Sequence, residues 1–219
     1  MSLYYEADGI RLFHGDCLTD HREWLEADVL VTDPPYGISY ESNRNRDKRN
    51  KKKGRPIAAD GSTSARDSVL NAWIGPVVMF GRWDVPRPTG VHTRLIWDKG
   101  NTVGMGNLSI PWGRSDEEIY VIGTGFEGKR EGSVIRVQML MSGDSERPDH
   151  PTPKPVPLME RLILKTVGTI ADPFAGSGST LVAARNLGRK AIGVELEERY
   201  AEICAKRLAQ GALDFGDAS

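Results

Sequence analysis

The stretch TIADPFAGSGST at residues 169–180 decides the fold of this chain. Its first three residues are apolar or β-branched and predict a buried strand, and Thr180–Leu187 predicts a helix. A glycine-rich turn therefore joins a strand to a helix. A second strand, Ala191–Val194, follows and ends at Glu195. A strand, a crossover helix and another strand in this order are typical of a parallel sheet covered by helices.

The same alternation of short apolar runs with amphipathic segments extends along the rest of the chain. Further strands are predicted at residues 10–14, 29–32, 77–80, 95–97 and 118–122, and residues 133–140 predict an edge strand or a hairpin arm. Further helices are predicted at residues 18–26 and 67–74, from Pro157 onward, and at residues 197–209. Strands that alternate with helices in this way predict a doubly wound α/β fold.

The composition is that of an ordinary soluble protein. With 219 residues the chain is long enough to bury one core, and we expect a single domain over residues 1–219. No apolar run approaches the roughly 18 to 20 residues of a membrane span, and the first residues do not resemble a secretory signal, so we expect a cytoplasmic protein. Cys17 and Cys204 are far apart, and no cysteine or histidine spacing is typical of zinc, so we predict no metal.

The turn DPFAGSGST at residues 172–180 has the properties of a ligand-binding loop. Its glycines let the backbone approach a ligand, and the next helix offers free N–H groups at its N-terminus. Glu195 could accept hydrogen bonds from both ribose hydroxyls of an adenosine ligand. A P-loop would need a lysine where Ser179 stands, and a dinucleotide fingerprint would need a glycine where Leu181 stands. The features of the turn instead fit a nucleoside cofactor without pyrophosphate, such as S-adenosylmethionine. A tight turn without a ligand fits the same residues.

The tetrapeptide Asp33–Tyr36 closes the strand predicted at residues 29–32. Pro34 and Pro35 remove two N–H donors and hold φ at about −65°, so the turn is rigid and offers carbonyl oxygens as acceptors. Asp33 adds a carboxylate acceptor, and Tyr36 adds a flat aromatic face. The structural alternative is a proline-rich turn that only ends a strand.

This set of groups suits methyl transfer to an exocyclic amino group of a nucleobase. That nitrogen is a poor nucleophile because its lone pair is delocalised into the ring. Two acceptors, Asp33 and a proline carbonyl, could hold its N–H bonds and direct the lone pair at a methyl donor. Tyr36 would stack on the base once it is flipped out of the duplex. The predicted partner is therefore duplex DNA with one base flipped out.

A basic run, RNRDKRNKKKGR at residues 44–55, follows the tetrapeptide. The whole chain has a net charge of −1, whereas this run is strongly basic. Such a stripe can neutralise phosphates and release their counterions, so we predict that the loop at residues 41–66 contacts DNA. The alternatives are a solvated loop and a localisation signal. The predicted DNA-contacting residues are Arg44, Arg46, Lys48, Arg49, Lys51, Lys52, Lys53 and Arg55.

With both motifs in one chain, the sequence resembles the amino-group DNA methyltransferases, which methylate N6 of adenine or N4 of cytosine. Their signature joins a tetrapeptide of this type to a cofactor turn similar to DPFAGSGST, and the order of the two motifs here resembles their β arrangement. The resemblance implies a circularly permuted class I methyltransferase fold with S-adenosylmethionine as cofactor. It also implies a seven-stranded, mostly parallel sheet with one antiparallel strand and the cofactor at the carboxyl ends of the strands.

The resemblance further assigns residues to the cofactor. The segment GDCL at residues 15–18 resembles the one whose aspartate contacts the cofactor adenine, and HPTPKP at residues 150–155 resembles the box whose lysine lies near the cofactor's carboxylate end. RLIWDKG at residues 94–100 and the strand after Arg114 also resemble family segments, without an assigned role. The predicted cofactor-binding residues are Asp16, Cys17, Lys154, Asp172, Phe174, Gly176, Ser177, Gly178, Ser179, Thr180 and Glu195.

The substrate is less fully determined. Asp33 at the first tetrapeptide position favours adenine N6, because serine is commoner in the cytosine N4 enzymes. Recognition of a DNA sequence would fall on residues 101–149, which are few for this family, so a homodimer or a recognition partner is possible. Asp33 and the motif order argue against methylation of protein glutamine, and the intact motifs argue against a non-catalytic relic of the fold. RNA stays an alternative substrate.

Overall fold

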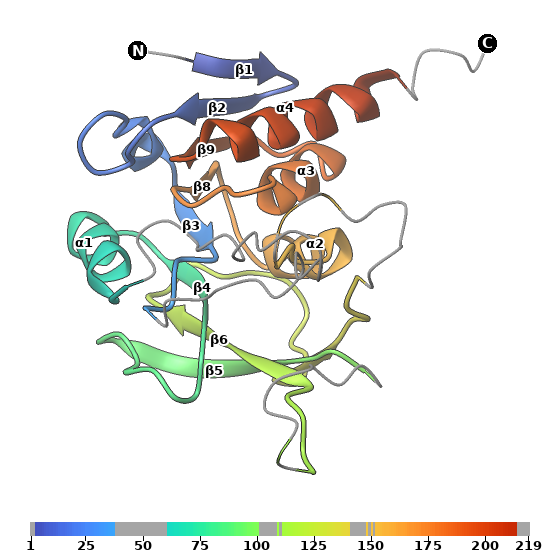
Figure 1. The fold of residues 1–219 in the computed structure, drawn as a ribbon. Helices are drawn as coiled ribbons and strands as arrows, with labels where there is room; N and C mark the ends of the chain where they lie inside the picture. The colour runs from blue at the N-terminus through green and yellow to red at the C-terminus, as the bar shows by residue number, and fades with distance from the viewer. Residues whose placement is uncertain are drawn as a thin grey trace, which may run out of the picture.

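The structure is a computed structural model that describes residues 3–37, 61–100, 109, 111–140, 148, 150 and 152–213. One mixed sheet forms its centre, and helices cover both faces (Figure 1). The strands are β1 (Leu3–Ala7), β2 (Ile10–His14), β3 (Val29–Thr32), β4 (Val77–Gly81), β5 (Val91–Asp98), β6 (Asp116–Ile122), β7 (Val134–Arg136), β8 (Ile170–Asp172) and β9 (Ala191–Glu195). The helices are the 3₁₀-helix η1 (Glu23–Glu26), α1 (Ser64–Ala72), α2 (Val156–Ile163), α3 (Ser179–Asn186) and α4 (Glu198–Leu213).

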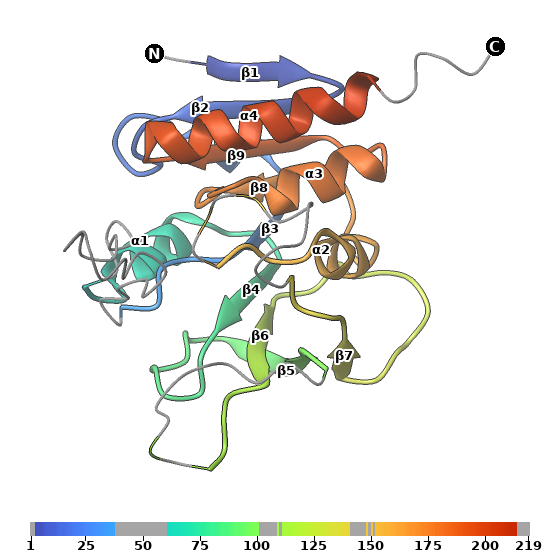
Figure 2. The same ribbon diagram turned by 45° about the vertical axis from the view of Figure 1, so that its right-hand side comes forward.

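The strands lie in the order β1-β2-β9-β8-β3-β4-β6-β5-β7 (Figure 2). Strands β2, β9, β8, β3 and β4 run parallel, so their carboxyl ends meet at one edge of the sheet. From β8 the chain continues through α3 to β9 on one side, whereas from β3 it continues through α1 to β4 on the other. The strand order thus reverses between β8 and β3, which are parallel, and open α/β sheets bind ligands in the crevice at such a switch point.

The α/β class and the mostly parallel sheet are confirmed, but the expected number of strands was wrong. Among the described residues the sheet has nine strands rather than seven. The seven from β2 to β5 include one antiparallel strand, β6, as expected. Edge strand β1 pairs antiparallel with β2, which makes two antiparallel strands, and β7 pairs parallel with β5. These edges give a weak sequence signal because β1 has no buried residue and β7 has only three residues.

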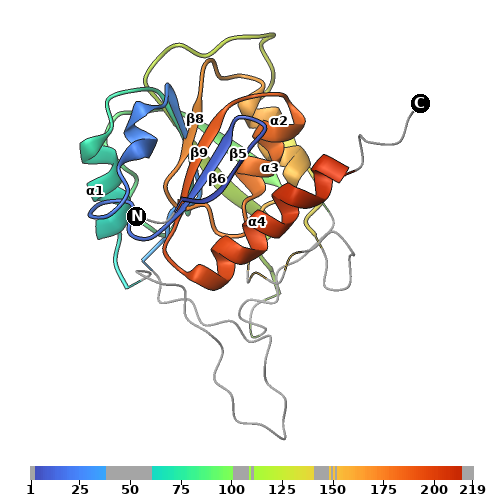
Figure 3. The same cartoon turned by 90° about the horizontal axis from the view of Figure 1, so that it is seen from above.

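Helices α2, α3 and α4 cover one face of the sheet, and α1 and η1 cover the other (Figure 3). The core is accordingly divided into two groups of buried side chains. Val29 and Val31 of β3 belong to the group under α2, α3 and α4, whereas Leu30 belongs to the group that includes Trp24 of η1 and Val69 of α1. This division follows from the strand geometry, because successive side chains point to opposite faces.

The predicted elements are present with shifted ends, and one differs in kind. Residues 18–26 were expected to form a helix, but only η1 is helical there. The carbonyl of Asp16 accepts the N–H groups of Asp20 and His21 at 2.9 and 3.0 Å. Because the bond from His21 reaches back five residues instead of four, a regular helix cannot continue from this turn. Residues 133–140 were expected to form an edge strand or a hairpin arm. Only Val134–Arg136 form a strand there, and it is an edge strand, since β7 pairs parallel with β5.

The described residues contain neither a membrane-spanning helix nor a cluster of metal-binding side chains. No helix in this part of the chain is long and apolar enough to cross a bilayer. No group of three or more His, Cys, Asp or Glu side chains within the same residues could hold a metal ion. Cys17 and Cys204 are both buried and free.

Candidate active site

Four carboxylates stand where neighbouring parallel strands end. In the order of the adjacent strands β2, β9, β8 and β3 they are Asp16, Glu195, Asp172 and Asp33. Strands β3 and β8 pair directly, with Val29 opposite Ile170 and Leu30 opposite Ala171. The tetrapeptide leaves β3 and the glycine turn leaves β8, so the two motifs begin side by side on the same edge of the sheet.

The glycine turn has the backbone conformation that its composition predicts. Gly176 and Gly178 have φ values of 54° and 83°, in the left-handed region that favours glycine. The N–H of Gly178 donates to the carbonyl of Ala175 at 2.8 Å, and α3 begins at the next residue. A Cβ on Gly178 would overlap Sγ of Cys204 in α4, because that helix packs directly against the turn. The turn thus points the N-terminus of α3 toward the carboxyl edge of the sheet.

Glu195 holds the glycine turn in place. Its Oε2 accepts the N–H of Gly176 at 2.7 Å, and its Oε1 accepts the N–H of Glu197 at 2.8 Å. Burial raises the pKa of Glu195 to about 7, although the two N–H donors oppose the shift. Each oxygen keeps lone-pair capacity for a further donor, so binding of ribose hydroxyls stays a prediction that the geometry permits.

Asp172 links the two motif-bearing strands. Its Oδ1 accepts the Thr32 hydroxyl of β3 at 2.7 Å and the N–H of Phe174 at 3.2 Å. Burial raises its pKa to about 6, while hydrogen bonds from Thr180 and Thr32 oppose the shift. Because the Asp172 side chain lies beneath the turn and is almost fully buried, it fixes the turn against β3. Direct contact with a cofactor stays a prediction for this residue.

The other predicted residues of the turn are buried or half-buried. Arg207 of α4 donates to the carbonyl of Ser177 at 2.6 Å and to Oγ of Ser179 at 3.5 Å. Thr180 is buried in the first turn of α3, and Phe174 packs partly buried against the side chains beneath η1. These contacts hold the turn to α4 and to the sheet, and a role for each residue in cofactor binding remains predicted.

Asp16 and Cys17 lie beside the end of β9. The N–H of Gly15 donates to the carbonyl of Glu195 at 3.0 Å, which brings their loop to that strand. Asp16 Oδ1 accepts the N–H of Leu18 at 2.7 Å. Cys17 is buried, and burial raises the pKa of its thiol to about 12, so it is a neutral packing group at physiological pH. The structure therefore brings these two residues to the same edge as Glu195.

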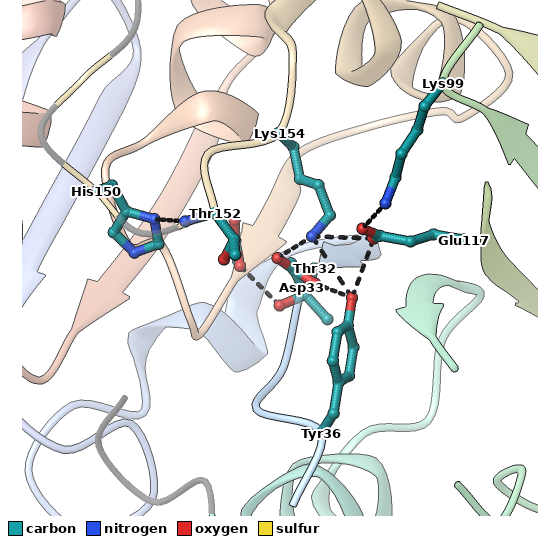
Figure 4. Close-up of polar contacts among 9 residues, drawn as sticks. Thr32, Asp33, Tyr36, Lys99, Glu117, His150, Thr152 and Lys154 are labelled. Carbon is teal, nitrogen blue, oxygen red and sulfur yellow. Dashed lines mark hydrogen bonds and ion pairs between the residues drawn. The ribbon is translucent and has the colours of Figure 1, made fainter. Parts of the chain in front are cut away.

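The tetrapeptide is the centre of a network of four charged side chains and a tyrosine (Figure 4). Asp33 accepts the Tyr36 hydroxyl on Oδ1 and the Lys154 ammonium on Oδ2, each at 2.6 Å. Glu117 of β6 lies on the other side, with Oε2 3.3 Å from Nζ of Lys154 and 3.4 Å from Oη of Tyr36. Its Oε1 lies 2.7 Å from Nζ of Lys99. Two carboxylates and two ammonium groups thus balance each other.

Burial and charge act against each other in this network. Burial raises the pKa of Asp33, and the Lys154 ammonium offsets this only in part. Burial also opposes the charge of Lys154 and of Glu117, but opposite charges outweigh it. The two carboxylates raise the pKa of Lys154, and the two lysines lower the pKa of Glu117. Lys154 and Glu117 are therefore charged, and Asp33 is the carboxylate of the network whose pKa is raised.

The contacts of Lys154 are not those that its predicted role implies. The sequence assigns this lysine to the carboxylate end of the cofactor, whereas its ammonium contacts Asp33 and Glu117. It also lies 4.8 Å from the centre of the Phe80 ring. The structure thus joins Lys154 to the tetrapeptide, and its contact with a cofactor stays a prediction.

A cavity of about 90 Å³ opens beside Tyr36. Trp83, which follows β4, lines it and keeps about two thirds of its side chain exposed. The Arg114 guanidinium lies 5.8 Å from the Trp83 ring centre and bonds Asp84 at 2.8 Å. Arg82 also binds Asp84, so the segment that presents Trp83 is held by charged groups rather than by apolar packing.

Sequence reasoning gave no role to Glu117, Lys99 or Trp83. Glu117 had a recognisable signal, because it lies two residues before buried Ile119 and so faces the same side of β6. A charged residue in register with core positions is unusual unless it is paired. No comparable signal marks Trp83, since an exposed tryptophan is identified only once its surroundings are known.

Other predicted regions lie wholly or partly outside the described residues. The basic run at residues 44–55 is outside them, so its eight predicted DNA-contacting residues have no structural description. Of the proposed recognition region at residues 101–149, the structure describes 109, 111–140 and 148. This part includes β6 and β7, which belong to the sheet. Within the described part of this region, recognition would therefore fall on the connections around these two strands.

The strand order, the inserted antiparallel β6 and the glycine turn beside the tetrapeptide define a class I methyltransferase fold. Two solved structures share it. M1.HpyAVI in complex with SAM has a TM-score of 0.64 at 24% identity, over 91% of this chain and 98% of that one. The cytosine-N4-specific PvuII DNA methyltransferase has a TM-score of 0.68 at 15% identity, over 93% and 88%. At these identities the likeness is one of fold.

Sequence comparison gives the family. The family model described as DNA methylase, for N6 and N4 methyltransferases, matches residues 40–206, which include the glycine turn and Glu195. The putative methylase YubD of Escherichia coli strain K12 is 47% identical over 232 residues, covering 95% of each chain. The chain belongs to the DNA methylase family of N6 and N4 amino-group methyltransferases.

Two type II methyltransferases are similar over a shorter segment. M2.DpnII of Streptococcus pneumoniae is 52% identical over 85 residues, which are 37% of this chain and 32% of that relative. M2.LlaDCHI of Lactococcus lactis subsp. cremoris is 42% identical over 89 residues, which are 39% and 33%. The matched segment therefore spans about a third of the length of these relatives.

Proposed function

We propose that the chain transfers a methyl group from S-adenosylmethionine to the N6 amino group of an adenine in DNA, with the base flipped out of the duplex. The observation that carries the proposal is the pairing of β3 with β8. It puts the tetrapeptide and the glycine turn at adjacent strand ends, so an amino group at one and a methyl donor at the other would be neighbours. Family membership supports the same chemistry.

The residues along the carboxyl edge fit S-adenosylmethionine. Its sulfonium is a cation, and carboxylates at the ends of four adjacent strands favour a cationic ligand. Gly176 and Gly178 add no side chains to the turn, and Glu195 retains acceptor capacity for ribose hydroxyls. When bound, the cofactor supplies an electrophilic methyl group, whose bond to sulfur breaks, leaving the electron pair on sulfur, as the bond to the amino nitrogen forms.

The tetrapeptide would prepare the amino group and then remove its proton. Asp33 and a proline carbonyl accept the two N–H bonds, which draws the nitrogen lone pair out of conjugation with the ring. After methyl transfer the nitrogen carries a positive charge and must lose one proton to become the neutral methylamino group. Asp33 is the base nearest to it, and because burial raises the pKa of Asp33 it is suited to take that proton.

The target base would occupy the cavity beside Tyr36. The Tyr36 ring is the stacking surface that the sequence predicts, and Trp83 provides a second aromatic side chain at the same cavity. Stacking of a base on an aromatic side chain stabilises it by about 1–3 kcal/mol, which offsets much of the cost of flipping.

Adenine is favoured over cytosine by Asp33 at the first position of the tetrapeptide. Methylation of cytosine N4 is the second candidate, because the same pair of acceptors suits either amino group and the PvuII enzyme of that specificity shares the fold. Contact of the basic run at residues 44–55 with phosphates, and a homodimer or recognition partner, are further parts of the proposal.

The test is to incubate the chain with plasmid DNA and methyl-labelled S-adenosylmethionine, digest the DNA to nucleosides and identify the labelled one. N6-methyldeoxyadenosine is expected. N4-methyldeoxycytidine would overturn the choice of base and leave the chemistry intact. If the chain bound the cofactor in calorimetry but labelled neither DNA nor RNA, the proposed activity would be wrong. Asp33→Ala, which should keep cofactor binding and lose transfer, is the control.

A further inference from the structure

Both carboxylate oxygens of Asp33 already accept a strong hydrogen bond. Tyr36 donates to one and Lys154 to the other, each at 2.6 Å (Figure 4). Under the proposed function, on which this inference rests, the same carboxylate must also accept an N–H bond from the target amino group. A carboxylate has lone pairs for further donors, but short bonds to a charged donor are among the strongest in proteins. A second acceptor that competes with Asp33 for the Tyr36 hydroxyl and the Lys154 ammonium would therefore affect the reaction.

The charge of Lys154 makes the competition more important. Methyl transfer places a positive charge on the amino nitrogen, which Asp33 contacts. An ammonium on the same carboxylate repels that charge and partly neutralises the carboxylate that should stabilise it. Catalysis is favoured by interactions that strengthen in the transition state, so Asp33 acts best when its link to Lys154 has loosened.

Glu117 is placed to receive both donors. Its Oε2 is 3.3 Å from Nζ of Lys154 and 3.4 Å from Oη of Tyr36, so each is close to a second acceptor. A shift of Nζ by about 0.7 Å, the difference between 3.3 and 2.6 Å, would make Glu117 instead of Asp33 the nearest carboxylate of Lys154. Lys99 holds Oε1 of Glu117 at 2.7 Å, which keeps the second acceptor in position.

We propose that Glu117 is a positioning residue for methyl transfer, which takes over Lys154 and the Tyr36 hydroxyl as the target amino group binds to Asp33. The exchange keeps Lys154 paired throughout, as a nearly fully buried ammonium requires. It also leaves Asp33 with its full negative charge when the nitrogen becomes positive. Glu117 acts through Lys154 and Tyr36 in this arrangement, although its side chain also lines the cavity beside Tyr36.

The test is the single-turnover rate of methyl transfer in the full chain carrying Glu117→Gln or Glu117→Ala. Without the second carboxylate, Lys154 stays on Asp33, and loss of a hydrogen bond between charged groups predicts a rate about 10- to 100-fold lower. The Kd for S-adenosylmethionine should not change, whereas the thermal unfolding temperature should fall because Lys99 and Lys154 each lose a carboxylate partner. Because Glu117 raises the pKa of Asp33, the acidic limb of the pH–rate profile should also move to lower pH in both variants.

Glu131→Gln is the matched control, because Glu131 also binds two basic side chains, Arg161 at 2.9 Å and Lys165 at 2.8 Å, away from the tetrapeptide. Its rate should equal that of the unchanged chain. An unchanged plateau rate in both Glu117 variants would overturn the inference. So would a rate loss accompanied by an equal loss of cofactor affinity, since that result describes a purely structural role. An inactive unchanged chain would instead refute the proposed function.

Discussion

The binding of S-adenosylmethionine should depend on pH through Glu195. This carboxyl has a pKa of about 7 because it is buried. In the role proposed for it, the ionised form would accept ribose hydroxyls and attract a cationic ligand. A carboxyl with this pKa is roughly one-tenth ionised at pH 6 and nine-tenths ionised at pH 8. If only the ionised form binds, the Kd should fall about tenfold between these two values.

Calorimetry of cofactor binding measures this effect directly. At pH 6, binding should release nearly one proton, which appears as a dependence of the heat on the ionisation enthalpy of the buffer. Asp172 has a pKa of about 6 and titrates nearby, so Glu195→Gln is needed to separate the two groups. The variant should lose most of the pH dependence and bind more weakly at pH 8. Equal Kd values for the unchanged chain at pH 6 and pH 8 would refute the reasoning.

The raised pKa of Glu195 also predicts how the stability of the chain without cofactor depends on pH. The folded pKa of Glu195 is raised from 4.5 to about 7, so between these values the folded chain holds a proton that the unfolded chain has lost. Stability is therefore fully present below pH 4.5 and decreases as the pH rises toward 7, by roughly 3 kcal/mol. Urea unfolding at pH 5 and pH 8 should show this decrease, and Glu195→Gln should reduce it. A variant with an undiminished pH dependence would assign the effect to other groups.

Three substitutions test other parts of the site. Gly178→Ala should destabilise the chain by roughly 2–4 kcal/mol and weaken cofactor binding, because its Cβ would overlap Cys204 at a positive φ; an unfolding midpoint that does not move would contradict this. Asp33→Ala should slow methyl transfer by about 100- to 10,000-fold with cofactor binding retained, and wild-type turnover would exclude its acceptor role. Trp83→Ala should weaken DNA binding about tenfold through lost stacking, measured by fluorescence anisotropy. Ile74→Ala, another exposed apolar side chain, is its control, and equal losses would argue against stacking.

Local properties of the chain were predictable from its sequence. The strand–turn–helix at residues 169–187 depends on glycine conformations, apolar periodicity and helix propensity, all of which act over a few residues. The tetrapeptide is rigid for the same kind of reason, since its prolines fix their own φ angles. Prediction failed where the local signal was weak, as at edge strand β1, or where a turn competed with a helix, as after Asp16.

Only the tertiary structure decided which charged groups meet. Lys154 donates to Asp33 across 121 positions of sequence, and Asp172 accepts from Thr32 across 140. Glu117 joins this network from β6, the antiparallel strand that pairs with β4 and β5. Such contacts depend on strand order and register, which the whole core determines, whereas turn conformation depends on neighbouring residues. The sequence alone therefore determined the two chemical motifs, and the fold determined the ion pairs that surround Asp33.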